Sequence, residues 1–404
     1  MKNIWIFNHH ALTPEMSGGT RHYDFAKELV QRGYKVSIFA SSFHYARHEE
    51  LKQYSNTFYK QENIDEIEFI WIKTRPYKGN GIGRVLNMLD YMLKVQKIQL
   101  STSPDVIIGS SVHLFAVYAA YKISKQYQVP FVMEVRDIWP QTLIDMGMSR
   151  WHPFVLLLGV LEKYLYSKAD KIISNLPYAY KHIQKFGIKK EDIIWISNGV
   201  DIHRSDKVEA YRFEKNKFHI TYAGSIGLAN QLDVLIKAAA LLENNSRVVV
   251  HIIGEGPLRK SLEMNKTSNV VFHGLVPKKQ AISMIKGSDV LFFPLADSPV
   301  FKFGISSNKL FDYLAAKKPI LFASNSMNNP IEDAKAGISV KAGDADAVAK
   351  AIESFMELSE KEMALFGANG SSYVSRNFSI SFLVTKLEDC LTSLVYNSSK
   401  NEKK

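Results

Sequence analysis

The residues best suited to chemistry lie between Gly304 and Asp312. Ser307 or Asn308 is a natural N-cap for a following helix, whose N-terminus offers unpaired N–H groups and the positive end of its dipole. Lys309 and Asp312 are three residues apart and therefore share one face of that helix. A cation with N–H groups suits a diphosphate, and a carboxylate suits a ribose with two hydroxyls. The alternative is a capped surface helix with an ordinary ion pair.

A second candidate is the glycine pair in Ser17-Gly18-Gly19-Thr20-Arg21. Paired glycines let a backbone approach a ligand closely, and the helix expected to begin at Arg21 would turn its N-terminus toward an anion. The alternative is a tight connection between a strand and a helix, with no ligand.

Two other motifs imitate known sites. Asp344-Ala345-Asp346 resembles a metal clamp, but it follows Gly343 and opens a helix, so we interpret its acids as an N-cap and dipole partners and predict no metal. Gly79-Asn80-Gly81-Ile82-Gly83 is separated from the preceding strand and has no acidic partner in the pattern. We interpret it as a mobile loop on the acceptor side.

The elements that would position these residues alternate between short strands and longer helices. This alternation predicts βαβ units and a parallel sheet. Strands are expected at 4–7, 35–40, 68–73, 105–108, 130–134, 171–174 and 193–196, and helices at 21–32, 84–100, 113–127, 152–169 and 177–186.

A second series follows the motif Asn198-Gly199-Val200-Asp201 and a polar stretch that ends at Lys217. Strands are expected at 219–223, 248–253, 270–273, 290–294 and 320–323, with helices at 231–242, 278–286 and 308–317. The prediction is an α/β protein of two doubly wound, Rossmann-like domains with a ligand cleft between the carboxyl ends of their strands. The expected division is 1–200, a linker at 201–217, 218–378, and a C-terminal helix and tail at 379–404 that packs back on the first domain.

Composition agrees with a globular chain, at 46% hydrophobic and 23% charged residues. The single cysteine, Cys390, excludes an internal disulfide and fits a reducing cytoplasm. The start of the chain lacks a signal-peptide pattern, and the longest apolar run, 154–161, is shorter than the ~20 residues that span a bilayer. A net charge of +11 calls for an anionic partner. We expect no nucleic acid, because the sequence has no compact basic-aromatic recognition motif.

Several motifs in order over nearly the whole chain resemble glycosyltransferase family 4. They are Gly18-Gly19, Asn198-Gly199-Val200-Asp201, Gly254-Glu255-Gly256-Pro257 and the Ser-x-Lys-x-x-Asp-Tyr segment around Lys309. Glu134-Val135-Arg136-Asp137-Ile138-Trp139-Pro140 and Tyr222-Ala223-Gly224-Ser225-Ile226-Gly227 look more narrowly like the N-acetyl-L-fucosamine transferase branch of bacterial O-antigen and capsule synthesis. The resemblance implies the GT-B fold, a nucleotide-sugar donor and no metal or other cofactor.

The family's Glu-x7-Glu motif departs from its pattern here. The later Glu, which holds the donor ribose, is Asp312, and the earlier one falls on Gly304. The usual Arg and Lys after the first strand of the second domain fall near Ser225 and Asn230. We expect Lys309, and Arg21 reaching across the cleft, to replace that positive charge. The resemblance implies a donor site made of Gly18, Gly19, Arg21, Gly224, Ser225, Gly254, Gly304, Ile305, Ser306, Ser307, Asn308, Lys309 and Asp312.

On the acceptor side, a histidine that contacts the donor sugar in many family members is matched by Arg136 or Asp137. We expect catalytic roles for both and for Lys309, with a buried pair that fixes the loop as the alternative. His113, Arg75 and Lys78 are further acceptor-side candidates, although His113 also fits a helix cap.

The resulting hypothesis is a retaining, metal-independent glycosyltransferase. It would move a sugar, such as an N-acetylated deoxyhexosamine, from a UDP-linked donor to a polyprenyl-diphosphate-linked or glycan acceptor on the cytoplasmic face of an anionic membrane. The alternatives are a degenerate nucleotide-sugar-binding protein and a nucleotide-sugar epimerase on the same fold.

Overall fold

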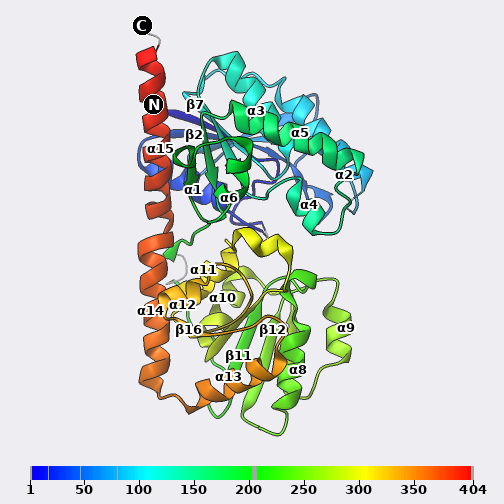
Figure 1. Ribbon diagram of the computed structural model, residues 1–404, viewed down its shortest axis with the longest axis vertical. Helices are drawn as coiled ribbons and strands as arrows, with labels where there is room; N and C mark the ends of the chain where they lie inside the picture. Colours follow the sequence, from blue (N-terminus) through cyan, green and yellow to red (C-terminus); the bar gives the residue numbers. More distant parts are fainter. Residues whose placement is uncertain (1, 17, 46, 80, 203–206, 402–404) are drawn as a thin grey trace. The chain divides into compact units, whose positions relative to one another are not determined.

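The computed structural model describes residues 2–16, 18–45, 47–79, 81–202 and 207–401 (Figure 1). Ser17, Asn80 and residues 203–206 of the expected linker therefore lie outside the described residues. The chain divides into two compact units. Unit 1 is Met1–Ser197 with Ile380–Lys404, and unit 2 is Asn198–Ser379.

Unit 1 is built on an eight-stranded sheet in the order β10-β9-β8-β7-β1-β2-β6-β5. All neighbouring strands are parallel except β5 and β6. The strands are β1 (Asn3–Phe7), β2 (Lys35–Ser41), β5 (Tyr59–Ile64), β6 (Ile67–Ile72), β7 (Val106–Ser110), β8 (Phe131–Val135), β9 (Lys171–Ser174) and β10 (Ile193–Trp195). A separate antiparallel pair, β3 (Phe43–His44) and β4 (Glu49–Glu50), follows β2.

Helices cover both faces of this sheet. Because side chains alternate along a strand, Ile4 and Ile6 of β1 pack with α1 and the C-terminal helix, whereas Trp5 and Phe7 face the other way, and Trp5 lies against Tyr127 of α3. Unit 1 contains α1 (Arg21–Gln31), α2 (Ile82–Val95), α3 (Leu114–Tyr127), α4 (Gln141–Asp145), α5 (Pro153–Lys168), α6 (Tyr180–Ile183) and α15 (Ile380–Asn401). Strands buried on both faces explain the nearly continuous apolar runs in the sequence.

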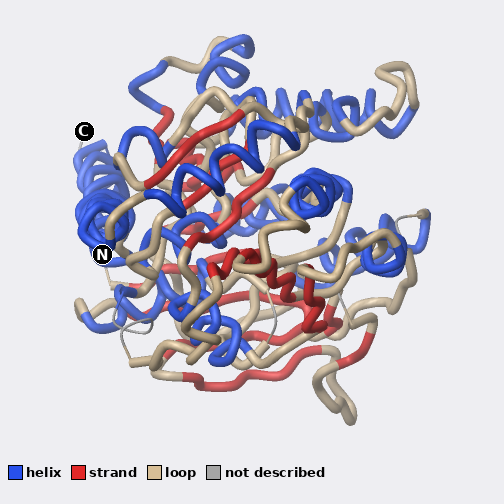
Figure 2. The backbone as a smooth tube through the Cα atoms, turned by 90° about the horizontal axis from the view of Figure 1, so that it is seen from below, coloured by secondary structure: helices blue, strands red, loops and turns tan. Residues whose placement is uncertain are grey.

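Unit 2 has a six-stranded, wholly parallel sheet in the order β13-β12-β11-β14-β15-β16. Figure 2 shows the helices, strands and loops of the chain from below the view of Figure 1. The strands are β11 (Phe218–Ala223), β12 (Val248–Ile253), β13 (Val270–Gly274), β14 (Val290–Pro294), β15 (Ile320–Ala323) and β16 (Gly337–Val340). The helices are α8 (Asp233–Leu241), α9 (Arg259–Met264), α10 (Lys278–Gly287), α11 (Asn308–Ala315), α12 (Pro330–Ala334), α13 (Ala345–Glu357) and α14 (Glu360–Phe378).

Each sheet reverses its strand order once. In unit 1 the reversal lies between β1 and β7, and in unit 2 it lies between β11 and β14. The loops that leave the two strands at a reversal run to opposite faces, which opens a crevice at the carboxyl ends of the strands. These two places are therefore where ligands are expected.

The predicted α/β class with two Rossmann-like domains is confirmed, and every strand expected from the sequence is present within a few residues. The sequence analysis missed the short strands β3, β4, β5 and β16 and the short helices α4, α9 and α12. The helix expected at 177–186 is reduced to α6 and a 3-10 turn, Gln184–Phe186. Within the described part of the chain, no helix has the length and hydropathy that a membrane crossing requires.

Helix α15 completes the core of unit 1. Leu383, Leu387 and Leu391 recur every four residues, so they form one stripe, and each is at most 2% exposed. The stripe packs with α1, and Arg32 after α1 donates to Glu388 at 2.8 Å. The last helix of the chain is thus part of the first unit.

Leu391→Ala should lower the free energy of unfolding of unit 1 by about 2–5 kcal/mol, because it removes a fully buried leucine side chain and leaves a cavity. Chemical denaturation measures the change. Leu365→Ala on α14, at a side chain 59% exposed, is the control and should shift stability by less than about 0.5 kcal/mol. Equal shifts in the two variants would contradict this role for α15.

Candidate functional site

Lys309 lies at the strand reversal of unit 2. It is the second residue of α11, and its Nζ is 4.2 Å from the ring centre of Tyr222 in β11 and 4.9 Å from that of Phe293 in β14. Nζ also donates to the Tyr222 hydroxyl and to Oδ1 of Asn230, both at 3.1 Å. Desolvation lowers the pKa of Lys309 to about 7. The ammonium is therefore held over the ends of the two central strands, and none of these four contacts is with a carboxylate.

Three glycines hold the loops around this ammonium close together. A Cβ on Gly224 would lie 3.2 Å from Lys309 Nζ. A Cβ on Gly254 would lie 1.9 Å from the Gly224 carbonyl oxygen, and one on Gly256 would lie 2.2 Å from that of Ile226. Side chains at these positions would push the loops after β11 and β12 apart. The Gly-x-Gly-Pro turn thus supports the Gly224 loop from behind.

The loop from Gly304 to Ser307 leads into α11 and is fixed by two asparagines. Gly304 has φ +87°, a conformation that favours glycine over any side chain. Asn328 Oδ1 accepts the N–H of Ile305 at 2.8 Å. The N–H of Asn198 donates to Ser306 Oγ at 2.8 Å, and its side-chain amide donates to the Ser306 carbonyl at 2.5 Å. The Asn-Gly-Val-Asp motif therefore anchors the loop that precedes α11.

Ser307 is at the N-cap position of α11 with extended backbone, although among the described residues no side chain caps this helix. Asn308 and Lys309 form its first turn, so the first N–H groups of α11 accompany the ammonium. Asp312 follows one turn later and is exposed. A cation, a helix N-terminus and a carboxylate thus occur together at one end of unit 2, with Ser225 in the adjacent loop. This arrangement suits a nucleoside diphosphate.

Arg21 differs from its predicted role as a ligand that reaches across a cleft. It is 4% exposed, and its guanidinium donates to Glu134 at 2.8 Å, to the Ile196 carbonyl at 2.8 Å and to the Ser197 carbonyl. His22 binds the other oxygen of Glu134 at 2.6 Å. These contacts hold the pKa of Glu134 well below its usual range. Arg21 therefore ties α1 to β8 and to the end of unit 1.

Gly18 lies against Leu12 and Tyr45 of unit 1 and has φ +140°. A Cβ there would be 2.5 Å from Leu12 Cδ1, so glycine is needed for close packing within the unit. Its neighbour Gly19 is described and leads into α1, whereas Ser17 is outside the described residues. The pair is consistent with the tight strand-to-helix connection that was the alternative interpretation.

The acceptor-side candidates divide into a buried and an exposed group. His113 is 1% exposed and caps α3 by accepting the N–H of Ala116 at 3.1 Å, which confirms its alternative role as a cap. Arg136 is half-buried and Asp137 exposed, directly after β8. Arg75 and Lys78 are exposed before α2. His113 follows β7 at the strand reversal of unit 1, and Arg136 and Asp137 follow the neighbouring strand β8, whereas Arg75 and Lys78 lie elsewhere in unit 1.

The Asp344 carboxylate accepts the N–H of Ala347 at 2.8 Å and so caps α13, as its motif predicted. Among the described side chains, no three His, Cys, Asp or Glu residues come together in a way that could hold a metal ion.

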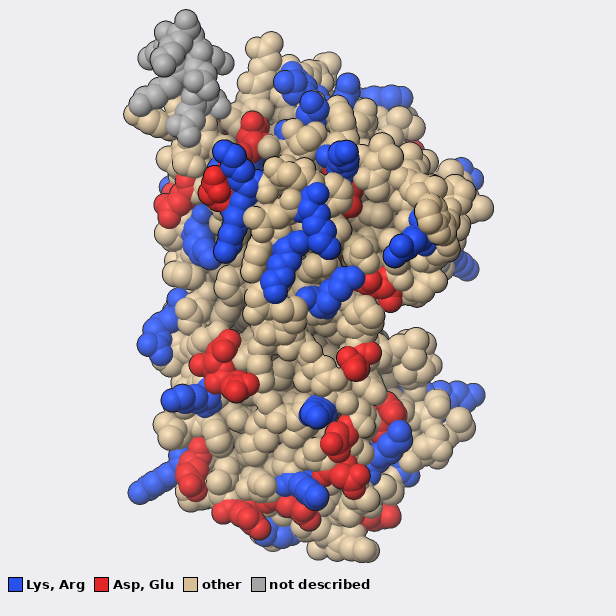
Figure 3. Space-filling view, in the orientation of Figure 1, with Lys and Arg blue, Asp and Glu red and all other residues tan. Residues whose placement is uncertain are grey.

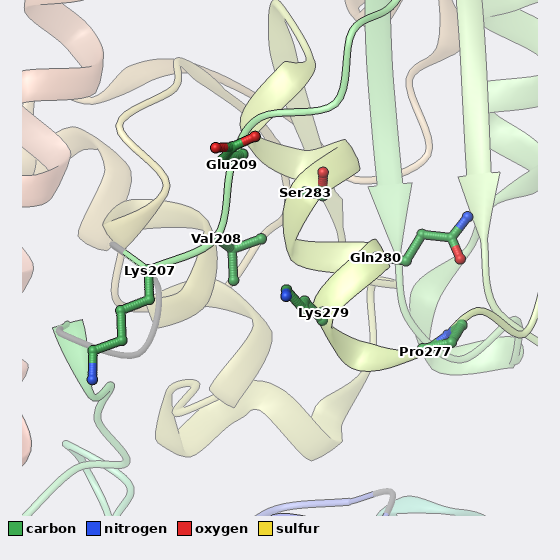
Figure 4. Close-up of a pocket in the computed structure, with 7 residues that line it drawn as sticks. All are labelled: Lys207, Val208, Glu209, Pro277, Lys279, Gln280 and Ser283. Carbon is green, nitrogen blue, oxygen red and sulfur yellow. The ribbon is translucent and has the colours of Figure 1, made fainter.

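A groove of about 560 Å³ in unit 2 lies apart from these residues. Figure 4 shows the segment 207–209 on one wall and α10 on the other. No residue that the sequence predicted for donor or acceptor binding lines it. Conversely, the sequence did not single out Tyr222, Phe293, Asn328 or Tyr313, whose hydroxyl accepts the Ala223 N–H at 2.7 Å. Their side chains shape the site from strands and helices that ordinary core patterns already explain.

Family models match both units. The model for Glycosyltransferase Family 4 matches residues 17–204, and the model for Glycosyl transferases group 1 matches residues 217–357. A search of curated proteins found no match to this chain.

Solved structures show the same fold at low identity. A sucrose-phosphate synthase from Thermosynechococcus elongatus has a TM-score of 0.75 and 13% identity, covering 98% of this chain and 100% of that one. Anabaena HepE in complex with UDP has a TM-score of 0.66 and 15% identity over 98% and 100%. An E. coli structure bound with UDP-2-fluoro glucose has a TM-score of 0.73 and 11% identity over 96% and 99%. These likenesses agree with the GT-B fold of two Rossmann-like domains.

Lys309→Met should stabilise the protein, because it removes an ammonium whose burial is costly. The folded pKa of about 7 lies below the value of about 10.4 expected for an unfolded lysine, so the unfolded state binds more protons between these values. Wild-type stability therefore rises with pH across this window. The gain from the substitution should be largest below pH 7 and shrink toward pH 10, as measured by thermal unfolding. Lys260→Met, at an exposed lysine, is the control and should show no such trend.

Proposed function

We propose that this chain, whose two units match glycosyltransferase family models, moves a sugar from a UDP-linked nucleotide-sugar to an acceptor, with retention of configuration and without a metal ion. The donor would bind unit 2 and the acceptor unit 1. UDP is favoured because structural neighbours hold UDP or UDP-glucose.

The observation that carries this proposal is the Lys309 ammonium at the strand reversal of unit 2. Its neighbours Tyr222 and Asn230 are neutral, so the positive charge is unbalanced until an anion arrives. The first N–H groups of α11 and the Gly224 loop lie next to it. A diphosphate would meet a cation and N–H donors together, and its charge would raise the pKa of Lys309 and keep it protonated.

In the proposed reaction the bond between the anomeric carbon and the diphosphate oxygen breaks, and a bond from that carbon to the acceptor oxygen forms. The acceptor proton passes to the leaving diphosphate oxygen. Lys309 is the catalytic residue we assign, because it would neutralise charge that grows on the leaving group. This desolvated cation stabilises the transition state more than the ground state.

Asp312 supports recognition of the nucleoside. It is exposed on α11, one turn beyond Lys309, where its carboxylate can accept hydrogen bonds from the two ribose hydroxyls. Gly304 has no side chain for the donor sugar, so backbone groups of the loop up to Ser307 would take over that contact. This departure is also the observation that favours a degenerate binding protein as the second candidate function.

The acceptor we propose is a lipid-linked diphosphate glycan of surface polysaccharide synthesis, reached at an anionic membrane face. Helix α5 supports this. It buries Val155, Leu158 and Leu165 but exposes Leu157 (55%) and Val160 (72%). Only one face of this apolar helix is therefore buried in unit 1.

The exposed face of α5 combines apolar and basic side chains. Trp151, 75% exposed, precedes the helix, and Lys163 and Lys168 are exposed on it. Figure 3 shows Lys and Arg outnumbering Asp and Glu on the visible face of unit 1. An apolar strip with a basic surround binds anionic bilayers reversibly, at on the order of 1 kcal/mol for each basic residue.

Asp312→Ala should raise the dissociation constant of UDP about tenfold or more, since charge-assisted hydrogen bonds contribute roughly 1.5–3 kcal/mol.

Lys309→Ala should reduce turnover of the donor more than donor binding. Calorimetric titration gives binding, and product analysis with and without acceptor, in EDTA, gives turnover.

The same experiment separates the alternatives. UDP binding without transfer to any acceptor would identify a degenerate binding protein, and donor conversion without acceptor would identify an epimerase. Loss of activity in EDTA with rescue by manganese would contradict metal independence. Unchanged UDP affinity in Asp312→Ala would remove the ribose assignment.

Leu157→Glu combined with Val160→Glu should abolish co-sedimentation with anionic vesicles, because it places two carboxylates on the exposed strip of α5. Wild type should bind anionic but not neutral vesicles, and salt should weaken the binding. Leu241→Glu, at a leucine 56% exposed in unit 2, is the matched control and should bind as wild type does. Equal sedimentation of all three proteins would contradict the membrane surface.

A further inference from the structure

A cluster of histidines lies at the strand reversal of unit 1 and has no part in the donor site. His9 and His10 follow β1, and His113 follows β7. The rings of His9 and His113 are each 1% exposed, and His9 stacks on Tyr91 with 4.4 Å between ring centres. The ring of Tyr45, a residue that is 37% exposed, lies 5.1 Å from the ring of His10 and separates the cluster from solvent on that side.

Hydrogen bonds fix the protons of two of these rings. His113 Nδ1 accepts the backbone N–H of Ala116, so in the neutral ring the proton is on Nε2. That Nε2–H donates to His9 Nδ1 at 2.6 Å. His9 must then carry its own proton on Nε2. Burial lowers the pKa of both rings well below the usual value, which keeps them neutral and preserves this order.

The hydrogen bonds from Ala116 N–H to His113 and from His113 to His9 form a relay. This relay ends in polar atoms that lack a protein partner. Among the described residues, His9 Nε2 and both ring nitrogens of His10 are shielded from solvent and form no hydrogen bond. Buried polar groups are nearly always paired, so three such atoms on adjacent residues need an explanation. The structure thus holds an N–H donor at His9 and a donor and an acceptor at His10, all within one cluster.

Two arginine side chains lie close enough to His10 to act on it electrostatically. Arg84, in the first turn of α2, and Arg136, after β8, both act electrostatically on His10 and, with its burial, lower its pKa to about 3. Two acids lie near these cations. Glu134 is bound to Arg21 and His22, and Arg84 and Arg136 both act on the Asp137 carboxylate. Because Glu134 is balanced by Arg21, the two arginines still exceed the single Asp137 by one positive charge beside the unpaired imidazoles.

We propose that the cluster binds a phosphate or diphosphate group of the acceptor, with His9 Nε2–H as donor and Arg84 and Arg136 as counter-charges. The inference rests on the proposed function, since it names the part of the acceptor that unit 1 recognises. His113 is a positioning residue. Because its Nδ1 accepts an N–H at the N-terminus of α3, its Nε2–H donates to His9 Nδ1, and the proton of His9 is therefore held on Nε2. A neutral relay with a fixed direction needs no reorganisation when the anion binds.

The test titrates inorganic pyrophosphate into the full-length chain saturated with UDP, so that the donor site is already filled. His9→Phe keeps an aromatic ring against Tyr91 but removes the N–H, and Arg136→Gln removes one cation. Each should weaken pyrophosphate binding about tenfold or more. His113→Asn keeps a good helix cap but breaks the relay, so it should weaken pyrophosphate binding in a variant that still binds UDP as the wild type does. Arg150→Gln, the same charge change at an exposed arginine of unit 1, should leave binding unchanged.

Two ligands then distinguish the source of the phosphate. Glucose 1-phosphate represents a soluble sugar phosphate, and farnesyl diphosphate represents a lipid-linked diphosphate. The ligand that competes with pyrophosphate, and that binds more weakly to His9→Phe, identifies the source of the phosphate group. UDP binding with no pyrophosphate binding, or equal pyrophosphate binding in all variants, would overturn this inference and leave the donor assignment intact. Farnesyl diphosphate binding that His9→Phe and Arg136→Gln do not change would also overturn it. Failure of UDP to bind would instead count against the proposed function.

Discussion

The reversal of strand order in each parallel sheet is the constraint on which both sites depend. Where neighbouring strands send their connections to opposite faces, no following segment covers the carboxyl ends of those strands. In unit 1 this places His9 beside His113, 104 residues later. In unit 2 it places Lys309 over Tyr222 and Phe293. The topology thus brings together polar groups that no local pattern connects.

Both places hold polar groups at a cost to stability. Unit 2 keeps an ammonium over two aromatic rings, and unit 1 keeps imidazoles with unpaired nitrogens. A desolvated cation or an orphaned ring nitrogen is unfavourable by itself, so the surrounding structure has to hold it in position. Around Lys309 this support comes from glycine contacts and Asn198, and around His9 it comes from a helix cap and a stacked tyrosine. Such groups can bind an anion without rearrangement, because the protein itself leaves their charge or their hydrogen-bonding capacity unpaired.

Local patterns predicted most of the fold because the central strands are apolar runs bounded by turns. The strand β5 was missed because its sequence, Tyr59 to Ile64, is largely polar, as an antiparallel edge strand permits. Lys309 and Asp312 could be found because capping and helical spacing are local properties. Arg21 was misplaced, since its partner Glu134 lies 113 residues away and nothing near Arg21 indicates the pair. His9 and His10 gave no signal, because their importance arises only from the packing of β1 beside β7.

Helix α15 belongs to unit 1 but follows unit 2 in the sequence, so it is synthesised after unit 2. At about 5–20 residues per second, ribosomal synthesis of Asn198–Ser379 takes on the order of ten seconds or more, during which the first 197 residues wait for their final helix. The apolar surface of α1 that Leu383, Leu387 and Leu391 later cover is exposed throughout that interval. A prematurely terminated chain would keep it exposed, and chaperones and proteases recognise such surfaces. The first core can therefore be completed only after the whole of unit 2 has been synthesised.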